Sequence, residues 1–204
     1  MKLIFGTTNK RKTEDLQNII NEMNLDIEVI SMEDIGWDRG EIDENGTTIE
    51  ENSLIKAQAI SSFCQDHNIH YPIMTDDAGL FVDVLNGEPG IYTARYADDE
   101  LSLDPSLPKH QCIVKLLRKM DGEMNRKAKY KCCVTSMMTN GDYHQEIGES
   151  EGIIAKEIIG QLKKPYFYSV FILNNTNVAF NELKGEEIDN TYRYNAIRKS
   201  LKRF

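Results

Sequence analysis

The chain has 204 residues, of which 40% are hydrophobic and 28% are charged, and its formal net charge is −9. These proportions are ordinary for a globular protein and exclude wholesale disorder. The acidic balance argues against a protein that binds long nucleic acids, because such a protein normally carries a basic patch. It still admits a small anionic substrate, since a metal ion and a few local cations can reverse the field inside a site.

Neither a membrane span nor a secretory leader is expected. No apolar run approaches the roughly 20 residues that cross a bilayer, and the N-terminal MKLIFGTTNK turns polar too soon for a signal peptide. The four cysteines show no C-x-x-C spacing, and the adjacent Cys132 and Cys133 would point to opposite faces of a strand. We therefore expect four reduced thiols in a cytoplasmic protein with no membrane partner.

The first third of the chain alternates predicted strands and helices. Residues 2–5 (KLIF) predict a buried strand, and the apolar residues at 16, 19, 20 and 23 predict a helix after the polar turn TTNKRK. A second strand is expected within residues 27–32. Thr48 and Glu51 form a capping-box pattern, which predicts a second helix from about residue 49 to residue 67.

The rest of the chain adds further strands and two helices. The segment PIMTDDAGLFVDVL predicts a strand, a tight turn at Asp76–Gly79 and another apolar segment. A helix is expected around residues 110–120, β-structure over 128–154 broken by the turn TNGD, a strand over 166–173 (YFYSVFIL), and a closing helix. The pattern predicts a mixed α/β sheet in a single domain of residues 1–204.

Four polar clusters could carry chemistry. The first is residues 7–12 (TTNKRK), at a strand-to-helix turn where a phosphate could sit; a solvated helix start is the alternative. In the second, Glu44 precedes a helix on which Asn52 and Lys56 share a face. Taken alone, this second cluster is more simply an ordinary charged helix.

The third and fourth clusters also have two interpretations each. Asp76 and Asp77 between apolar segments suit a hard divalent ion such as Mg²⁺, beside which an acid could take a proton from water. An Asx-turn capped by its own backbone is the alternative. Arg193 opens the last helix, where its planar fork suits phosphate, although a surface arginine is the default.

Together and in this order, the clusters resemble the inosine triphosphate pyrophosphatase family, also called the Ham1-like family. The segment DDAGLFVDVLNGEPGIYTARY, Asp76 to Tyr96, matches the family's D-D-S-G-L-x-V-D-x-L-x-G-x-P-G-x-Y-S-A-R-Y, with Ala78 in place of the Ser. The likeness extends weakly through GESEGII to the last helix. The family's T-x-N-x-x-K, E-x-G and E-N-x-x-x-K motifs are present as Thr7, Asn9 and Lys12, as Glu44 and Gly46, and as Glu51, Asn52 and Lys56.

The resemblance implies a two-lobed fold around a long mixed sheet with flanking helices, an active-site cleft between the lobes, and a homodimer. It implies hydrolysis of non-standard purine nucleoside triphosphates (ITP, dITP and XTP) between the α- and β-phosphates, with Mg²⁺ as cofactor. Carried over, Glu44, Asp76 and Asp77 would handle the metal, and Asp77 would activate the attacking water. The groups that would contact the phosphates and the rest of the substrate are Thr7, Thr8, Asn9, Lys12, Asn52, Lys56, Arg95 and Arg193.

The departures from the family concern the base. The family's F-G-Y-D-P-x-F aligns with residues 165–171 (PYFYSVF), so that Tyr168 stands where the Asp would be, and its S-H-R becomes T-Y-R. A base pocket is therefore expected at Phe167, Tyr168 and Tyr192, with altered base-reading groups. Two alternatives stay open: the same chemistry on a modified or pyrimidine nucleotide, and a nucleotide-binding protein with little turnover.

Overall fold

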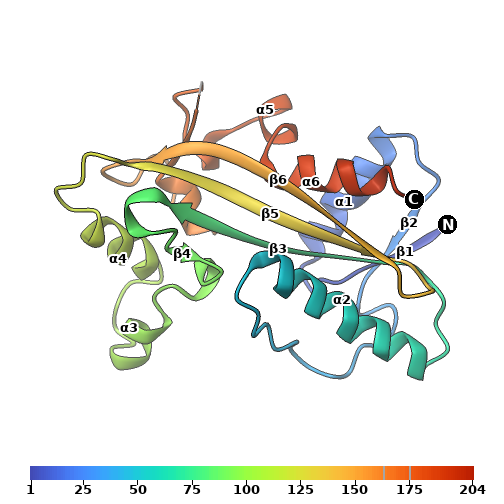
Figure 1. The fold of residues 1–204 in the computed structure, drawn as a ribbon. Helices are drawn as coiled ribbons and strands as arrows, with labels where there is room; N and C mark the ends of the chain where they lie inside the picture. Colours follow the sequence, from blue (N-terminus) through green and yellow to red (C-terminus); the bar gives the residue numbers. More distant parts are fainter. Residues whose placement is uncertain (163, 175) are drawn as a thin grey trace. The chain divides into compact units, whose positions relative to one another are not determined.

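The computed structural model describes residues 1–162, 164–174 and 176–204 of the chain. Within these residues seven strands form one sheet in the order β2-β1-β3-β5-β6-β7, with β4 paired to β3 (Figure 1). The strands are β1 (Lys2–Phe5), β2 (Glu28–Ile30), β3 (Ile73–Val82), β4 (Pro89–Gly90), β5 (Lys127–Met137), β6 (Tyr143–Ile154) and β7 (Phe171–Leu173). The α-helices are α1 (Lys10–Glu22), α2 (Ile49–Asp66), α3 (Asp98–Leu103), α4 (Gln111–Lys119), α5 (Glu186–Asp189) and α6 (Tyr192–Leu201).

The sheet is mixed, as predicted. Strand β1 pairs in parallel with both β2 and β3, with Leu3 opposite Val29 and Ile4 opposite Ile73. The later pairs β3–β4 and β6–β7 are antiparallel. Leu3 and Ile4 are fully buried, because a parallel strand is covered on both of its faces and is therefore apolar throughout. The predicted α/β class is confirmed.

The chain divides into two compact units. The first comprises Met1–Asp77, Cys132–Gly148 and Arg193–Phe204, and the second comprises Ala78–Lys131 and Glu149–Tyr192. Strands β3, β5 and β6 each contribute residues to both units. In the first unit, α1 and α6 lie over one face of the sheet and α2 lies over the other (Figure 1).

Helix α2 begins at its predicted capping box. Thr48 is the N-cap, and its hydroxyl accepts a hydrogen bond of 3.1 Å from the Glu51 N–H. The Glu51 carboxylate accepts a hydrogen bond of 2.6 Å from the Thr47 N–H. In a standard capping box this second bond comes from the N–H of the N-cap residue, which here is Thr48. Ile60 and Phe63 of α2 are fully buried in a core shared with Ile4 of β1. This start therefore determines where the polar residues of α2 stand over the sheet.

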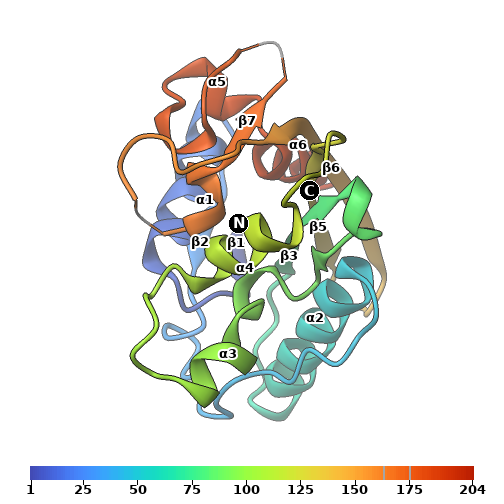
Figure 2. The same cartoon turned by 90° about the vertical axis from the view of Figure 1, so that its left-hand side faces the viewer.

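In the second unit, α3 and α4 lie side by side (Figure 2). Gln111 of α4 donates to Glu100 of α3 at 2.6 Å, and Lys115 pairs with Asp99 at 2.7 Å.

Among the described residues, none of the helices combines the length and the apolar character that a membrane crossing requires.

The predicted tight turn at Asp76–Gly79 is wrong. Strand β3 runs without a break from Ile73 to Val82. Two adjacent aspartates are typical of turns, but here the strand is held on both sides, since Phe5 of β1 pairs with Met74 and Gly90 of β4 pairs with Leu80. The pairing of distant segments therefore outweighs the local turn preference.

The predicted strand over residues 166–173 is half right. Strand β7 covers only its last three residues, whereas Tyr166–Ser169 forms a short 3-10 helix. The Tyr168 N–H donates to the Pro165 carbonyl at 3.1 Å, which closes this helical turn. The aromatic residues that suggested a strand pack instead in a cluster of rings, so their burial does not depend on strand alternation.

Candidate functional site

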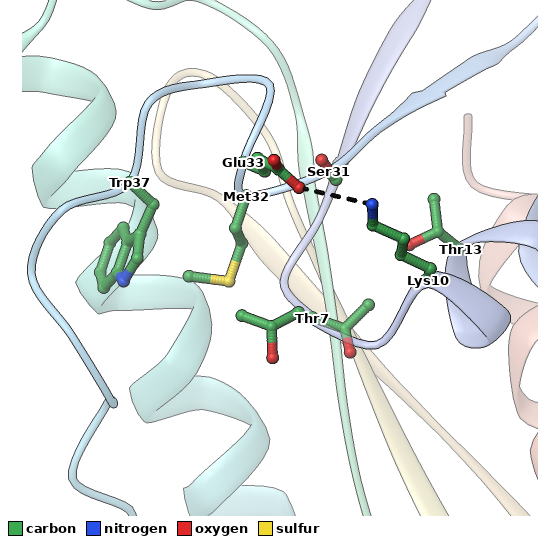
Figure 3. A pocket seen from close by; sticks show the side chains of 8 residues that line it. Thr7, Lys10, Thr13, Ser31, Met32, Glu33 and Trp37 are labelled. Atoms are coloured by element: carbon green, nitrogen blue, oxygen red, sulfur yellow. Dashed lines mark ion pairs between the residues drawn. The ribbon is translucent and has the colours of Figure 1, made fainter.

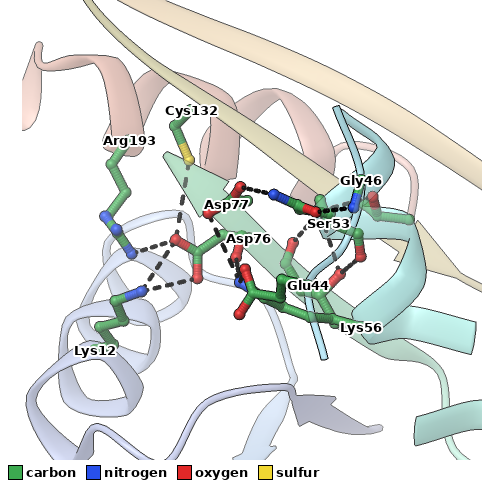
Figure 4. Close-up of polar contacts among 12 residues, drawn as sticks. Lys12, Glu44, Gly46, Ser53, Lys56, Asp76, Asp77, Cys132 and Arg193 are labelled. Carbon is green, nitrogen blue, oxygen red and sulfur yellow. Dashed lines mark hydrogen bonds and ion pairs between the residues drawn. The ribbon is translucent and has the colours of Figure 1, made fainter. Parts of the chain in front are cut away.

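Asp76 and Asp77 are neighbours on β3 and point in opposite directions. Successive side chains of a strand project from opposite faces, and Figure 4 shows Asp76 directed toward Lys12 and Arg193 while Asp77 lies toward Lys56. Only 2% of the Asp76 side chain and 15% of the Asp77 side chain are exposed. Each buried carboxylate therefore needs its own compensating partners.

We call Lys12, Asp76, Cys132 and Arg193 the Asp76 cluster. Lys12 of α1 lies 3.2 and 3.3 Å from the two carboxylate oxygens of Asp76. Arg193, in the first turn of α6, places Nη1 2.6 Å from Oδ2, and the Cys132 thiol lies 4.0 Å from the same oxygen. Two cations surround one carboxylate, so the cluster carries one net positive charge and suits an anion.

The charges within the Asp76 cluster stabilise one another. Burial by itself would raise the pKa of Asp76, but the positive charges of Arg193 and Lys12 outweigh it and hold that pKa well below its usual range. Burial lowers the pKa of Lys12, and the negative charge of Asp76 opposes this. Burial also raises the pKa of the Cys132 thiol, which therefore stays protonated and can donate a hydrogen bond to Asp76. Asp76 is thus ionised at neutral pH in spite of its burial.

We call Glu44, Asn52, Lys56 and Asp77 the Asp77 cluster. The Lys56 ammonium lies 3.0 Å from Glu44 Oε2 and 3.8 Å from Asp77 Oδ1, and it donates to the main-chain oxygen of Asp76 at 2.9 Å. Asn52 and Lys56 come from one face of α2, as their spacing of four predicted. Two carboxylates share one cation, so this cluster carries one net negative charge and suits a second cation.

Asn52 joins the Glu44 loop to β3. Its side-chain oxygen accepts from the Gly46 N–H at 2.9 Å, and its side-chain nitrogen donates to Asp77 Oδ2 at 3.2 Å. A Cβ at Gly46 would lie 2.7 Å from the Asn52 oxygen, so only glycine allows this approach. Asn52 is 1% exposed. The loop is therefore tied to Asp77 through a buried amide.

Glu44 and Asp77 fit a magnesium ion. Both carboxylates already converge on one positive charge, the Lys56 ammonium, and Mg²⁺ is usually bound by one or two carboxylates together with substrate phosphates and water. Among the described residues, no group of three His, Cys, Asp or Glu side chains is gathered closely enough to hold a metal ion. The predicted role of Glu44, Asp76 and Asp77 as metal ligands stays a prediction.

The threonines of the first predicted cluster border a pocket of about 190 Å³ (Figure 3). It lies where β1 and β2 end, and Lys10 Nζ stands 4.0 Å from Glu33 Oε2 beside it. Asn9 opens α1, because its main-chain oxygen accepts from the Lys12 N–H at 2.9 Å. The residues that line the pocket are Thr7, Thr8, Lys10, Thr13, Ser31, Met32, Glu33 and Trp37. The loop thus presents its hydroxyls to this pocket and Lys12 to Asp76.

The other predicted site residues belong to the second unit. The Arg95 guanidinium lies over the ring of Tyr92 at 5.5 Å. The hydroxyls of Tyr168 and Tyr192 are hydrogen-bonded at 2.6 Å, and the ring of Tyr192 is stacked on that of Tyr130 with centroids 5.0 Å apart. The structure thus brings two of the three predicted base-pocket residues into direct contact. The third, Phe167, is 3% exposed.

Sequence reasoning missed Cys132 as a member of the site. The available signal was the adjacency of Cys132 and Cys133, which in a strand must face opposite ways. All four cysteines are free, as expected. What the sequence lacks is the register that sets Cys132 of β5 beside Asp76 of β3.

The model of the Ham1 family matches residues 3–203 of the chain. The chain belongs to the Ham1 family. A dITP/XTP pyrophosphatase of Listeria innocua is 32% identical to it over 204 residues, which is 97% of this chain and 91% of the relative. Another from Thermoanaerobacter pseudethanolicus is 34% identical over 201 residues, covering 98% and 94% of the two chains. The Ham1 protein of Staphylococcus aureus, a solved structure, matches with a TM-score of 0.79 at 27% identity over 98% of this chain and 95% of that one.

Family membership confirms the resemblance drawn from the sequence motifs. Because the match covers nearly the whole chain, it includes both compact units and every residue of the Asp76 and Asp77 clusters.

Proposed function

We propose that this Ham1 chain is a nucleoside triphosphate pyrophosphatase that acts on non-standard purine nucleotides such as dITP, ITP and XTP. The activity for which its relatives are named, dITP/XTP pyrophosphatase, supports the reaction and the substrate class. The observation that carries the proposal is the pair of neighbouring clusters on β3. The Asp76 cluster has one net positive charge and suits the triphosphate, whereas the Asp77 cluster has one net negative charge and suits a metal ion.

In the proposed reaction a water molecule attacks the α-phosphorus. The bond between this phosphorus and the oxygen that bridges it to the β-phosphorus breaks, and that oxygen leaves with pyrophosphate. Asp77 accepts the proton of the attacking water. Lys12, Lys56 and Arg193 offset the charge of the phosphates, because phosphoryl transfer depends mainly on positioning and charge stabilisation. Mg²⁺ held by Glu44 and Asp77 would supply further charge neutralisation at the phosphate oxygens.

A panel of nucleoside triphosphates tests the function. We expect pyrophosphate release from dITP, ITP and XTP with Mg²⁺, little release from ATP and GTP, and none after the metal is removed with a chelator. If no triphosphate of the panel releases pyrophosphate, the alternative of a nucleotide-binding protein with little turnover is favoured. If release continues at an unchanged rate in the chelator, the metal assignment is wrong.

The Tyr168–Tyr192 pair supports a second candidate, which is the same chemistry on a different base. A phenol hydroxyl can both donate and accept a hydrogen bond, whereas an ionised carboxylate only accepts. A site that reads a base through tyrosines would therefore discriminate differently from one that uses the Asp and His of the family motifs. Preference in the same panel for a pyrimidine or modified nucleotide would favour this candidate.

We further propose that the protein is a homodimer, which the family resemblance supports, and that it is cytoplasmic, which the four free thiols support. Sedimentation velocity should give twice the mass of the chain, and cell fractionation should recover the protein with the cytoplasmic enzymes. A monomer that is fully active would refute the need for the dimer.

A further inference from the structure

We propose that Asp76 is a positioning residue that aims Lys12 and Arg193 at the phosphates, and that it does not ligate the metal ion. The inference rests on the proposed function and assigns two different roles to the three carboxylates of the site. Glu44 and Asp77 remain for the metal, whereas Asp76 acts through the two cations that it holds.

The direction of the side chains is the first argument. Asp76 and Asp77 project from opposite faces of β3. Lys12 and Arg193 approach Asp76 from α1 and α6, which cover one face, whereas Asn52 and Lys56 approach from α2 on the other (Figures 1 and 4). A single ion cannot easily bind two carboxylates that point away from each other.

The coordination capacity of Asp76 is the second argument. Lys12 contacts both carboxylate oxygens at 3.2 and 3.3 Å, and Arg193 and Cys132 both approach Oδ2. With 2% of its side chain exposed, Asp76 would have to release these partners before a hydrated ion could reach it. Glu44 pairs with Lys56 at 3.0 Å, but 30% of its side chain is exposed, so a hydrated ion can approach it from the solvent.

The third argument is the free-energy cost of burying Lys12 and Arg193 side by side. Two cations held close together repel each other, and each loses hydration when it is buried. A carboxylate between them removes the repulsion and fixes both donors, so that they are ordered before the substrate arrives. The net charge of the Asp76 cluster remains +1, which leaves it attractive to a phosphate.

The experiment separates metal binding from anion binding in the absence of turnover. Mn²⁺ affinity is measured by electron paramagnetic resonance of the free ion, and affinity for inorganic pyrophosphate is measured by calorimetry in EDTA. The variants are Asp76→Asn, Lys12→Met, their combination, and Glu44→Gln as the matched carboxylate control. The combined variant loses one positive and one negative charge, so its cluster keeps the net charge of the wild type.

We expect Asp76→Asn and the combined variant to bind Mn²⁺ nearly as the wild type does, whereas Glu44→Gln should weaken Mn²⁺ binding by about tenfold or more. Lys12→Met should weaken pyrophosphate binding by about tenfold in the wild-type background, and by much less in the Asp76→Asn background, because Lys12 is then no longer held in place.

Three results would overturn the proposal. The first is a loss of Mn²⁺ affinity in the combined variant as large as that in Glu44→Gln, and the second is an equal loss of pyrophosphate affinity on Lys12→Met in both backgrounds. If Asp76→Asn fails to fold, the Mn²⁺ affinity of the combined variant still decides. Absence of pyrophosphate binding by the wild type in EDTA would also overturn it, whereas the function itself is judged separately by the nucleotide panel.

Discussion

Asn52→Asp exchanges one atom of a buried side chain and reverses its electrostatic role. The amide nitrogen now donates to Asp77 Oδ2 at 3.2 Å. In the variant an ionised oxygen would replace it, and two like charges would face each other in a site where residue 52 is 1% exposed. If the new carboxyl keeps a proton, however, it can still donate to Asp77 and accept from the Gly46 N–H, as the amide does.

The distance between residue 52 and the Asp77 carboxylate sets the size of the repulsion. Two unit charges 3.2 Å apart repel by about 5 kcal/mol at an effective dielectric constant of 20. The Lys56 ammonium, 3.8 Å from Asp77, offsets part of this repulsion. We therefore expect the free energy of unfolding to fall by about 3 kcal/mol at pH 8, which corresponds to an acid whose pKa is raised by about two units in the folded state.

The sign of the pH dependence follows from that raised pKa. The folded variant binds its proton more tightly than the unfolded chain does, so the variant is nearly as stable as the wild type below the unfolded pKa of about 3.9. Its deficit then grows as the pH rises toward the folded pKa, and at pH 5 it should be about half of its value at pH 8.

Urea unfolding of both proteins at pH 5 and pH 8 measures this deficit. The chain offers a matched control, because the exposed Asn140 also donates its amide to an aspartate, Asp142, at 2.7 Å. Asn140→Asp should cost less than about 1 kcal/mol at either pH, since water screens an exposed pair. A deficit of Asn52→Asp that is equal at the two pH values, or larger at pH 5, would refute the reasoning.

Three further predictions concern the reaction, the strand and the base. Asp77→Asn should lower pyrophosphate release by about a hundredfold or more with an unchanged melting temperature, because it removes the proposed proton acceptor and keeps the shape of the side chain. Gly79→Ala should lower the free energy of unfolding by about 3 kcal/mol or more, since its Cβ would lie 2.4 Å from the Gly90 oxygen, well inside van der Waals contact. Tyr168→Phe removes one hydroxyl of the 2.6 Å pair with Tyr192, so it should cost about 1 kcal/mol in urea unfolding and change the order of preference in the nucleotide panel.

Each of these predictions has a contradicting result. Undiminished turnover of Asp77→Asn would exclude it as the acceptor of the proton. Wild-type stability of Gly79→Ala would mean that β3 and β4 separate without cost. An unchanged order of nucleotides after Tyr168→Phe would show that the tyrosine pair does not read the base.

The sequence by itself determined the local features and the family. The capping box places the start of α2 because its residues are three apart in the chain. The buried strand β1 follows from three apolar residues, Leu3, Ile4 and Phe5, and the spacing of Asn52 and Lys56 places them on one helix face. The motif from Asp76 to Tyr96 identifies the Ham1 family because its long order of residue types does not depend on how they are arranged in space.

Only the tertiary structure decided where the two aspartates point and which partners they have. Their motif is equally compatible with a turn, in which both carboxylates could approach one ion, and with a strand, in which they must separate. The pairing of β3 with β1 and β4 selects the strand, and this pairing joins segments that are distant in sequence. The same long-range contacts bring Lys12, Arg193 and Cys132 to Asp76 and leave Asp77 with Asn52 and Lys56. Adjacent residues thus acquire different partners because a strand turns successive side chains to opposite faces.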